Sequence, residues 1–293
     1  MPSNLFKLGF VHLEDLIFHE TCDFNRVRRL ADQIKKDGHL KNPILASNFP
    51  MKNNPVDPLS ADNSEKLLVL DGANRVSALK LLGYPDVLVQ KVDYWDPNVE
   101  LTSWGHLIFN IAKDKLIERF KSEGLEISPH ETEFKASDDE LGTLDENTLC
   151  LIIFRDRSTW MINPKESTLE YKVKSLYQIT SIYNMSWEIY PQLGNDSTSS
   201  VFDTLENCTV INILPRFTKE EVIDLLSRGI LFPFGVTRFV IPQRILGLGI
   251  SCSVLGAKVP LSEKNLFLKE LMSYRVKSKK ARFYEKSVFL FNE

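Results

Sequence analysis

The sequence predicts a mixed α/β protein in which strands and helices alternate over the first third of the chain. The clearest sign is the stretch 67–83, LLVLDGANRVSALKLLG, where an apolar run of strand length ends at an Asp-Gly turn and a helical pattern begins at once. A helix is also predicted over 24–37, between a strand around 10–16 and a short strand over 42–46. A strand over 87–92 completes a compact α/β layer.

Several predicted helices carry their own boundary signals. Asp23 is a good N-cap for the first helix, and Gly38 is its stop. In the second half of the chain, Thr218 and Glu221 have the spacing of a capping box, which opens a helix that ends at Gly229.

The second half of the chain predicts further strands and helices. Strands over 151–154 and 159–162 would form a hairpin, and residues 167–190 look helical. A strand over 209–214 follows, and another lies within 233–240. The C-terminus reads as a basic helical segment and a last apolar strand.

The middle of the chain suggests a division into domains. Residues 96–120 hold an amphipathic helix, and residues 121–147 are acidic and broken by glycine and proline. The predicted organisation is therefore an N-terminal domain over 1–120, an acidic linker or insertion over 121–147, and a C-terminal α+β domain over 148–293. Residues 47–66, rich in Pro, Asn, Asp and Ser, read as an exposed loop within the first domain.

Length, charge and cysteine content are those of an ordinary soluble protein. The 293 residues suffice for one large domain or two of ordinary size, and a net charge of −3 gives no general attraction for nucleic acid or anionic membranes. The four cysteines lack the paired spacing of a zinc site or a disulfide framework, which indicates reduced thiols. No apolar run has membrane-spanning length and the N-terminus lacks a signal pattern, so a cytoplasmic location is expected.

The turn after the apolar run at 67–70 is the main candidate site. The first amides of the following helix point into the turn and can bind an anion, Gly72 lets a ligand approach the backbone, and Arg75 can bind phosphate oxygens. Asp71 would repel a phosphate unless a cation lay between them. The sequence therefore predicts a metal–phosphate site with Asp71 on the metal side, although a plain Asp-Gly turn is the structural alternative.

Three other groups of residues are open to a functional or a structural interpretation. His19 and Glu20 follow the predicted first strand, where catalytic carboxylates often lie, although a glutamate in a loop is more often solvated surface. Trp104 and His106 could line a substrate pocket or pack in the core. Arg238 could bind a carboxylate or phosphate, or form a surface ion pair.

Five motifs, taken together and in this order, resemble the free L-serine kinases with a ParB/sulfiredoxin-like fold. They are FHET at 18–21, NPIL at 42–45, VLDGANR at 69–75, TSWGH at 102–106 and FGVTRF at 234–239. The resemblance covers the first 110 residues and returns near 209–240. It implies a ParB/sulfiredoxin-like N-terminal domain with a second, smaller α+β domain packed against it.

The resemblance implies a reaction and a set of site residues. A phosphoryl group would pass from ATP or ADP, with Mg²⁺, to the hydroxyl of free L-serine. Glu20 resembles the essential glutamate that acts as general base, and Asp71 resembles the second essential carboxylate, which binds Mg²⁺ or orients the hydroxyl. The implied nucleotide and phosphate residues are Gly72, Ala73, Asn74 and Arg75, and the implied serine-binding residues are Thr102, Trp104, His106, Thr237 and Arg238.

Asn74 departs from the family pattern, because relatives usually have histidine at this position. Asparagine can still donate a hydrogen bond to phosphate, but it cannot transfer a proton near neutral pH. Two other function classes stay open: a ParB-like DNA-binding transcriptional regulator, alone or combined with the kinase, and a nucleotide-binding sensor without turnover. The expected partners are serine and a nucleotide, without a membrane; the phosphoryl donor and the oligomeric state are open.

Overall fold

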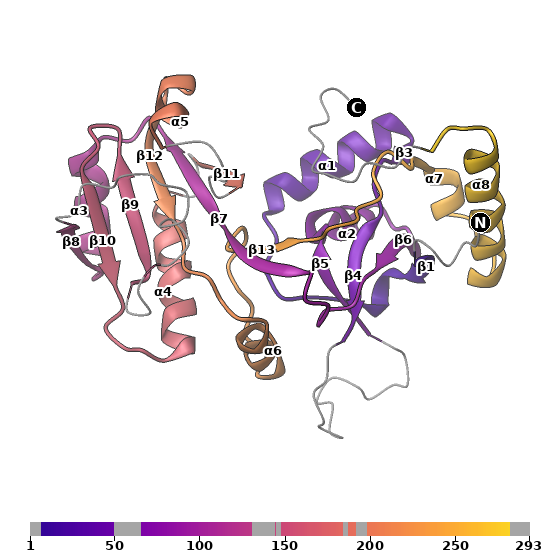
Figure 1. The fold of residues 1–293 in the computed structure, drawn as a ribbon, viewed down its shortest axis with the longest axis horizontal. Coiled ribbons are helices and arrows are strands. Elements are labelled where there is room, and N and C mark those ends of the chain that lie inside the picture. Colours follow the sequence, from indigo (N-terminus) through magenta and orange to yellow (C-terminus); the bar gives the residue numbers. More distant parts are fainter. Residues whose placement is uncertain are drawn as a thin grey trace. The chain divides into compact units, whose positions relative to one another are not determined.

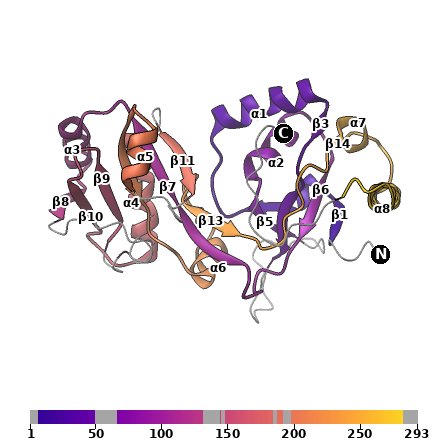
Figure 2. The ribbon, with the colours of Figure 1, turned by 45° about the horizontal axis from the view of Figure 1, so that its top comes forward.

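The structure is a computed structural model, and it describes residues 7–49, 66–130, 144, 148–183, 187–191 and 198–281. Strands and helices are mixed throughout, which confirms the predicted α/β class (Figures 1 and 2). The chain divides into two compact units. Unit 1 comprises Met1–Phe18, Cys22–Val99 and Ile241–Glu293, and unit 2 comprises His19–Thr21 and Glu100–Val240.

These units differ from the predicted domains 1–120 and 148–293. The chain returns to unit 1 after Val240, and the tripeptide His19–Thr21 belongs to unit 2. Composition shifts mark exposed stretches, but they cannot show which sheet a later segment rejoins, because that depends on pairing between residues far apart in sequence. Much of the predicted linker, at 131–143 and 145–147, lies outside the described residues.

Unit 1 is built on a five-stranded sheet with the order β1-β6-β4-β5-β2. Its strands are β1 (Leu8–His12), β6 (Asp86–Lys91), β4 (Ile44–Asn48), β5 (Leu67–Asp71) and β2 (Leu16–Phe18). The pairs β4–β6 and β2–β5 are parallel, and the other two are antiparallel. Strands β4, β5 and β6 are buried over most of their length, as their nearly unbroken apolar sequences require.

Helices α1 (Phe24–Asp37) and α2 (Ala73–Leu81) pack against each other in this unit (Figure 1). The prediction for α1 is confirmed at both ends. The Asp23 side chain accepts a hydrogen bond from the amide of Arg26, and Gly38 closes the helix in a left-handed conformation with φ of 69°. Its buried face carries Val27, Ala31 and Ile34.

Shorter elements and a C-terminal helix complete unit 1. They are the 3₁₀ turn η2 (Leu13–Asp15), the paired strands β3 (His39–Leu40) and β14 (Ile250–Ser251), and helices α7 (Cys252–Leu255) and α8 (Leu261–Lys277). The ammonium of Lys264 on α8 is buried and contacts Asp86 Oδ2 at 2.6 Å and the Leu255 carbonyl at 2.8 Å. Removing one partner of such a buried pair costs about 3–5 kcal/mol, so this contact fixes α8 to the sheet.

Unit 2 is built on a seven-stranded sheet with the order β11-β7-β12-β9-β10-β8, in which β13 also pairs with β7. Its strands are β11 (Trp187–Pro191), β7 (Glu100–Phe109), β12 (Cys208–Ile213), β9 (Cys150–Phe154), β10 (Thr159–Asn163), β8 (Glu126–His130) and β13 (Thr237–Val240). Every pairing is antiparallel. The predicted hairpin of β9 and β10 is confirmed.

Helices cover both faces of the unit 2 sheet. Helices α3 (Lys113–Ser122), α4 (Leu169–Ile182) and α6 (Lys219–Ser227) share one core with Ile152 and Phe154 of β9. Helix α5 (Thr198–Thr204) shares the other core with Leu151 and Ile153. The alternation of side chains along β9 therefore supplies both cores. The capping box of Thr218 and Glu221 at α6 is confirmed.

Two predicted elements need correction. The predicted helix within 96–120 is confined to α3, and the residues before it form the ten-residue strand β7, so the TSWGH motif lies on a strand. The predicted helix over 167–190 ends at Ile182, and β11 follows. Both strands owe their pairing to partners elsewhere in the chain, which outweighs local helical periodicity. The predicted last strand, 288–291, lies outside the described residues.

Candidate active site

Glu20 is held in place by pairing between its own tripeptide and a loop more than two hundred residues away. The amide of Phe232 donates to the carbonyl of His19 at 2.8 Å, and the amide of Thr21 donates to the carbonyl of Phe232 at 2.9 Å. The Thr21 hydroxyl accepts a further bond from the amide of Phe234 at 3.1 Å. These contacts on both sides of Glu20 fix its backbone.

The carboxylate of Glu20 is bound by the first residues of the FGVTRF segment. The amide of Gly235 donates to Oε2 at 3.1 Å, and both the amide and the hydroxyl of Thr237 donate to Oε1. Gly235 has φ of 78°, a left-handed conformation that favours glycine and turns the following amides toward the carboxylate. The left-handed backbone at this position therefore explains why the motif has glycine there.

Burial raises the pKa of Glu20 from its ordinary value near 4.5 to about 7. Hydrogen bonds from Thr237, Gly235 and Val236 act against this shift, because they stabilise the charged form. Desolvation outweighs them. The side chain can therefore exchange a proton in the neutral pH range.

His19 supports the same carboxylate through Thr237. Its Nε2 lies 2.8 Å from Thr237 Oγ1, and its ring packs edge-on against Phe239. Because the Thr237 hydroxyl donates its single proton to the ionised Glu20, Oγ1 accepts from His19 Nε2–H. His19 is buried and acts on Glu20 through this hydroxyl.

His106 lies behind the Glu20 loop, fully buried at 0% exposure. Its Nε2 contacts the Gly235 carbonyl at 2.8 Å, and its Nδ1 contacts the Tyr183 hydroxyl at 2.9 Å. A carbonyl only accepts, so Nε2 carries the proton and Nδ1 accepts from Tyr183, which in turn accepts from Asn212 Nδ2 at 2.8 Å. This chain of bonds fixes Gly235, and the position of His106 is that of a positioning residue rather than one lining an accessible surface.

Thr102, Trp104 and Arg238 lie on one face of the paired strands β7 and β13. Thr102 is directly opposite Arg238 in the register, and the Arg238 guanidinium lies 4.7 Å above the Trp104 ring. Thr237, next to Arg238 in the strand, places its side chain on Glu20 instead. The side chains of Thr237 and Arg238, neighbours in the motif, therefore lie on opposite faces of the strand.

Tyr177 on α4 is a neighbour of Glu20 that the sequence analysis missed. Its hydroxyl donates to the Leu231 carbonyl at 3.1 Å and is bonded to the Thr21 side chain. Burial and the nearby Glu20 carboxylate raise the pKa of Tyr177, and the Thr21 contact lowers it. Nothing in the helical pattern of α4 distinguishes this tyrosine from a packing residue, so no sequence signal identified it.

In unit 1, Asp71 ends β5 and Gly72 starts α2, as the sequence predicts. Gly72 has φ of 106°, and a Cβ there would lie 2.9 Å from Arg75 Nη2 and from Ile44 Cδ1. The turn thus requires glycine for two reasons: the φ angle is left-handed, and a side chain would collide with Arg75 and Ile44. No side chain caps the N-terminus of α2. In this first turn, Asn74 Oδ1 is buried without a hydrogen-bond partner among the described residues.

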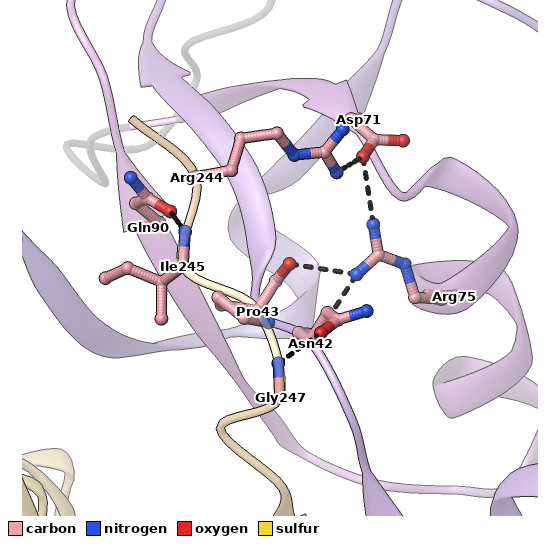
Figure 3. A network of polar contacts seen from close by, with 8 residues as sticks. All are labelled: Asn42, Pro43, Asp71, Arg75, Gln90, Arg244, Ile245 and Gly247. Carbon is pink, nitrogen blue, oxygen red and sulfur yellow. Dashed lines mark hydrogen bonds and ion pairs between the residues drawn. The ribbon is translucent and has the colours of Figure 1, made fainter. Parts of the chain in front are cut away.

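The guanidinium of Arg75, predicted to bind phosphate, contacts the turn itself in the structure (Figure 3). Its Nη1 donates to the carbonyls of Asn42 and Pro43 at 3.0 and 2.9 Å, and its Nη2 donates to Asp71 at 3.2 Å. Burial lowers the pKa of Arg75, and the Asp71 carboxylate acts in the opposite direction. These contacts make Arg75 a support of the turn.

Arg244 is a second guanidinium on Asp71, and the sequence analysis missed it. Its Nη2 forms an ion pair with Asp71 Oδ2 (Figure 3). The two residues are far apart in sequence, and the segment around Arg244 has no regular secondary structure and no motif. Only the fold of unit 1 brings it to the turn.

Comparisons with known proteins find similarity to L-serine kinases. An ATP-dependent L-serine kinase from Staphylothermus marinus is 28% identical over 235 residues, which cover 79% of this chain and 84% of the relative. The ADP-dependent L-serine kinase SerK from Thermococcus kodakarensis is 24% identical over 243 residues, covering 83% and 90%. This chain is related to the free L-serine kinases. No protein-family model matches it.

A solved structure gives the same fold. SbnI with a C-terminal truncation, from Staphylococcus aureus, superposes with a TM-score of 0.65 at 19% identity and covers 92% of this chain and 97% of its own. The similarity extends through both units, beyond the five motifs that first suggested it. In the part of the chain that the structure describes, no helix is long and apolar enough to cross a membrane.

Proposed function

We propose that this chain transfers a phosphoryl group from ATP or ADP to the hydroxyl of free L-serine, giving O-phospho-L-serine. The observation that carries the proposal is Glu20, a partly buried carboxylate bound by the 235–237 loop with a pKa raised to about 7. Such a group can accept the serine proton near neutral pH. The names of the relatives, L-serine kinases that depend on ATP or on ADP, support the substrates.

In this proposal Glu20 is the general base. It accepts the hydroxyl proton as the serine oxygen bonds to the terminal phosphorus of the nucleotide, and the bond from that phosphorus to the bridging oxygen breaks. ATP then leaves as ADP, or ADP as AMP. Gly235 and Thr237 hold the carboxylate, and His106 holds Gly235 through its carbonyl. Phosphoryl transfer depends mainly on such positioning and on charge stabilisation.

The residues that we propose bind phosphate lie in unit 1. The backbone amides at the start of α2, from Gly72 to Asn74, would bind phosphate oxygens, and the side-chain amide of Asn74 would add a donor. Arg75 supports this turn by holding Asp71 and the carbonyls of Asn42 and Pro43.

Asp71 would hold Mg²⁺ through Oδ1, because the guanidiniums of Arg75 and Arg244 both contact Oδ2. Its carboxylate is 38% exposed and is a hard oxygen donor, and Mg²⁺ usually takes one or two protein carboxylates together with phosphate oxygens and water. Within the described residues no group of three or more His, Cys, Asp or Glu side chains could hold a metal ion alone. Bound there, Mg²⁺ would neutralise charge on the transferring phosphoryl group.

The face formed by Thr102, Trp104 and Arg238 is the proposed binding surface for serine. The Arg238 guanidinium would bind the serine carboxylate through two parallel hydrogen bonds. The Trp104 ring beside it restricts the orientation of the guanidinium. Thr237 contributes indirectly, because its side chain is engaged with Glu20.

The test incubates the purified protein with L-serine and Mg²⁺ and either ATP or ADP, and detects O-phosphoserine by mass spectrometry. Product is expected with at least one nucleotide and not in the absence of serine. No product with either nucleotide would contradict the proposal. A gel shift that prefers one DNA sequence at physiological salt, together with inactive protein, would favour the alternative of a DNA-binding regulator.

A further inference from the structure

Hydrogen bonds on both sides of Arg244 hold the segment 243–247 against the unit 1 sheet. Figure 3 shows those made by Ile245 and Gly247. The buried side chain of Gln90 on β6 donates to the Gln243 carbonyl at 2.6 Å and accepts from the Ile245 amide at 2.9 Å. The Gly247 amide donates to Asn42 Oδ1 at 2.8 Å. Since one glutamine bonds the residues immediately before and after Arg244, the backbone of this arginine is fixed without use of its own side chain.

The two arginines on Asp71 differ in what their guanidiniums can still do. Arg75 is 17% exposed, and it uses both terminal nitrogens on Asn42, Pro43 and Asp71. Arg244 is 38% exposed, and Asp71 is its one hydrogen-bond or ion-pair partner among the described residues. A guanidinium has five N–H donors. Arg244 therefore retains donors that could bind an anion, whereas Arg75 has committed both of its terminal nitrogens.

The local charge also favours an anion. Two guanidiniums share the single carboxylate of Asp71, which leaves an excess of one positive charge in this group of three. The N-terminus of α2, a nine-residue helix without a side-chain cap, begins two residues after Asp71 and adds its positive end.

We infer that Arg244 binds a phosphate group of the nucleotide, as the arginine that reaches the ligand while Arg75 supports the turn. This inference rests on the proposed function, because the nucleotide is the substrate named there. Arg244 lies outside every motif of the sequence. In this inference Arg244, and not Arg75, is the arginine that binds phosphate.

The test compares the affinities of ADP and adenosine, measured by calorimetry without serine. Arg244→Gln is expected to weaken ADP binding by about tenfold to a hundredfold, the effect of losing a charged hydrogen bond, and to leave adenosine binding within about twofold. The matched control is Arg228→Gln, because Arg228 is 37% exposed and is also paired with carboxylates, Glu170 and Asp224. Unchanged ADP binding in Arg244→Gln, or an equal loss for adenosine, would overturn the inference.

A double variant separates direct binding from an effect through Asp71. If Arg244 only neutralised Asp71, then Arg244→Gln would have no further effect in an Asp71→Asn background. Direct contact with phosphate predicts that ADP binding still weakens in that background. Wild-type protein that binds neither ADP nor ATP would instead contradict the proposed function itself, so the two failures are distinguishable.

Discussion

Glu20 in unit 2 and Asp71 in unit 1 carry the same chemical group in contrasting surroundings. Glu20 is partly buried, and its hydrogen bonds come from backbone amides and a threonine hydroxyl, which only partly offset desolvation. Asp71 is 38% exposed and lies between the guanidiniums of Arg75 and Arg244. The two surroundings suit different roles: the first carboxylate is set to exchange a proton, and the second is held by ion pairs with two guanidiniums.

The two carboxylates depend on one short stretch of chain. Residues 235–237 bind Glu20, and residues 243–247, fastened by Gln90 and Asn42, bring Arg244 to Asp71. Glu20 is held by residues far away in sequence, and Asp71 is held by the distant Arg244 as well as by its neighbour Arg75. The FGVTRF motif marks the first of these contacts, and no motif marks the second.

The largest expected effect comes from Glu20→Gln, which keeps the shape of the side chain and removes the base. We expect kcat for phosphoserine formation to fall by about 10²- to 10⁴-fold, with ADP affinity unchanged, because nucleotide binding is assigned to unit 1. Glu166→Gln, at an exposed position of the same unit, is the control and should retain full turnover. A fully active Glu20→Gln enzyme would remove Glu20 from the chemistry.

A smaller and different effect is expected from Asp71→Asn. The variant should need a higher Mg²⁺ concentration for half-maximal rate, by about tenfold or more, because a neutral amide is a weaker ligand for a hard cation. The measurement is a Mg²⁺ titration at saturating serine. Asp156→Asn is a matched control, since Asp156 is also an exposed aspartate paired with a cation, Lys113. An unchanged Mg²⁺ requirement would mean that Asp71 does not bind the metal.

Local signals predicted the parts of the fold and of the candidate site that are encoded within a few residues. The Asp23 cap, the Gly38 stop and the Asp-Gly turn at Asp71 all appear as expected, because each is determined by adjacent backbone geometry. The strand β7 was missed because its partners β12, β11 and β13 lie far along the chain. Strand assignments of this kind depend on tertiary pairing.

The roles of individual site residues depended on long-range contacts even more. Arg75 has the residue type and the helix position of a phosphate ligand, yet the carbonyls of Asn42 and Pro43 engage it. His106 resembles a pocket residue in sequence, yet it is buried behind Gly235. Arg244 has no sequence signal, because its position beside Asp71 depends on where Gln90 and Asn42 hold the neighbouring backbone.

The smallest effect tests the electrostatics of Glu20 directly. With a pKa of about 7, the base is protonated below that pH, so kcat/KM for serine should rise with pH through a midpoint near 7. Thr237→Val removes a hydrogen bond that stabilises the ionised form, so the midpoint should move upward by about one pH unit or less. Thr180→Val, which removes a hydroxyl bonded within α4, should leave the midpoint in place.

His19 offers the competing explanation for such a midpoint, since histidine ordinarily titrates near this pH. His19→Gln distinguishes the two, because glutamine keeps an N–H donor for Thr237 Oγ1 but has no proton to lose in this range. If Glu20 is the base, kcat/KM still rises with pH in His19→Gln. The midpoint of that rise still moves to higher pH when Thr237→Val is added. If the pH-dependent rise of kcat/KM disappears in His19→Gln, the titrating group is His19. Glu20 is then not the general base.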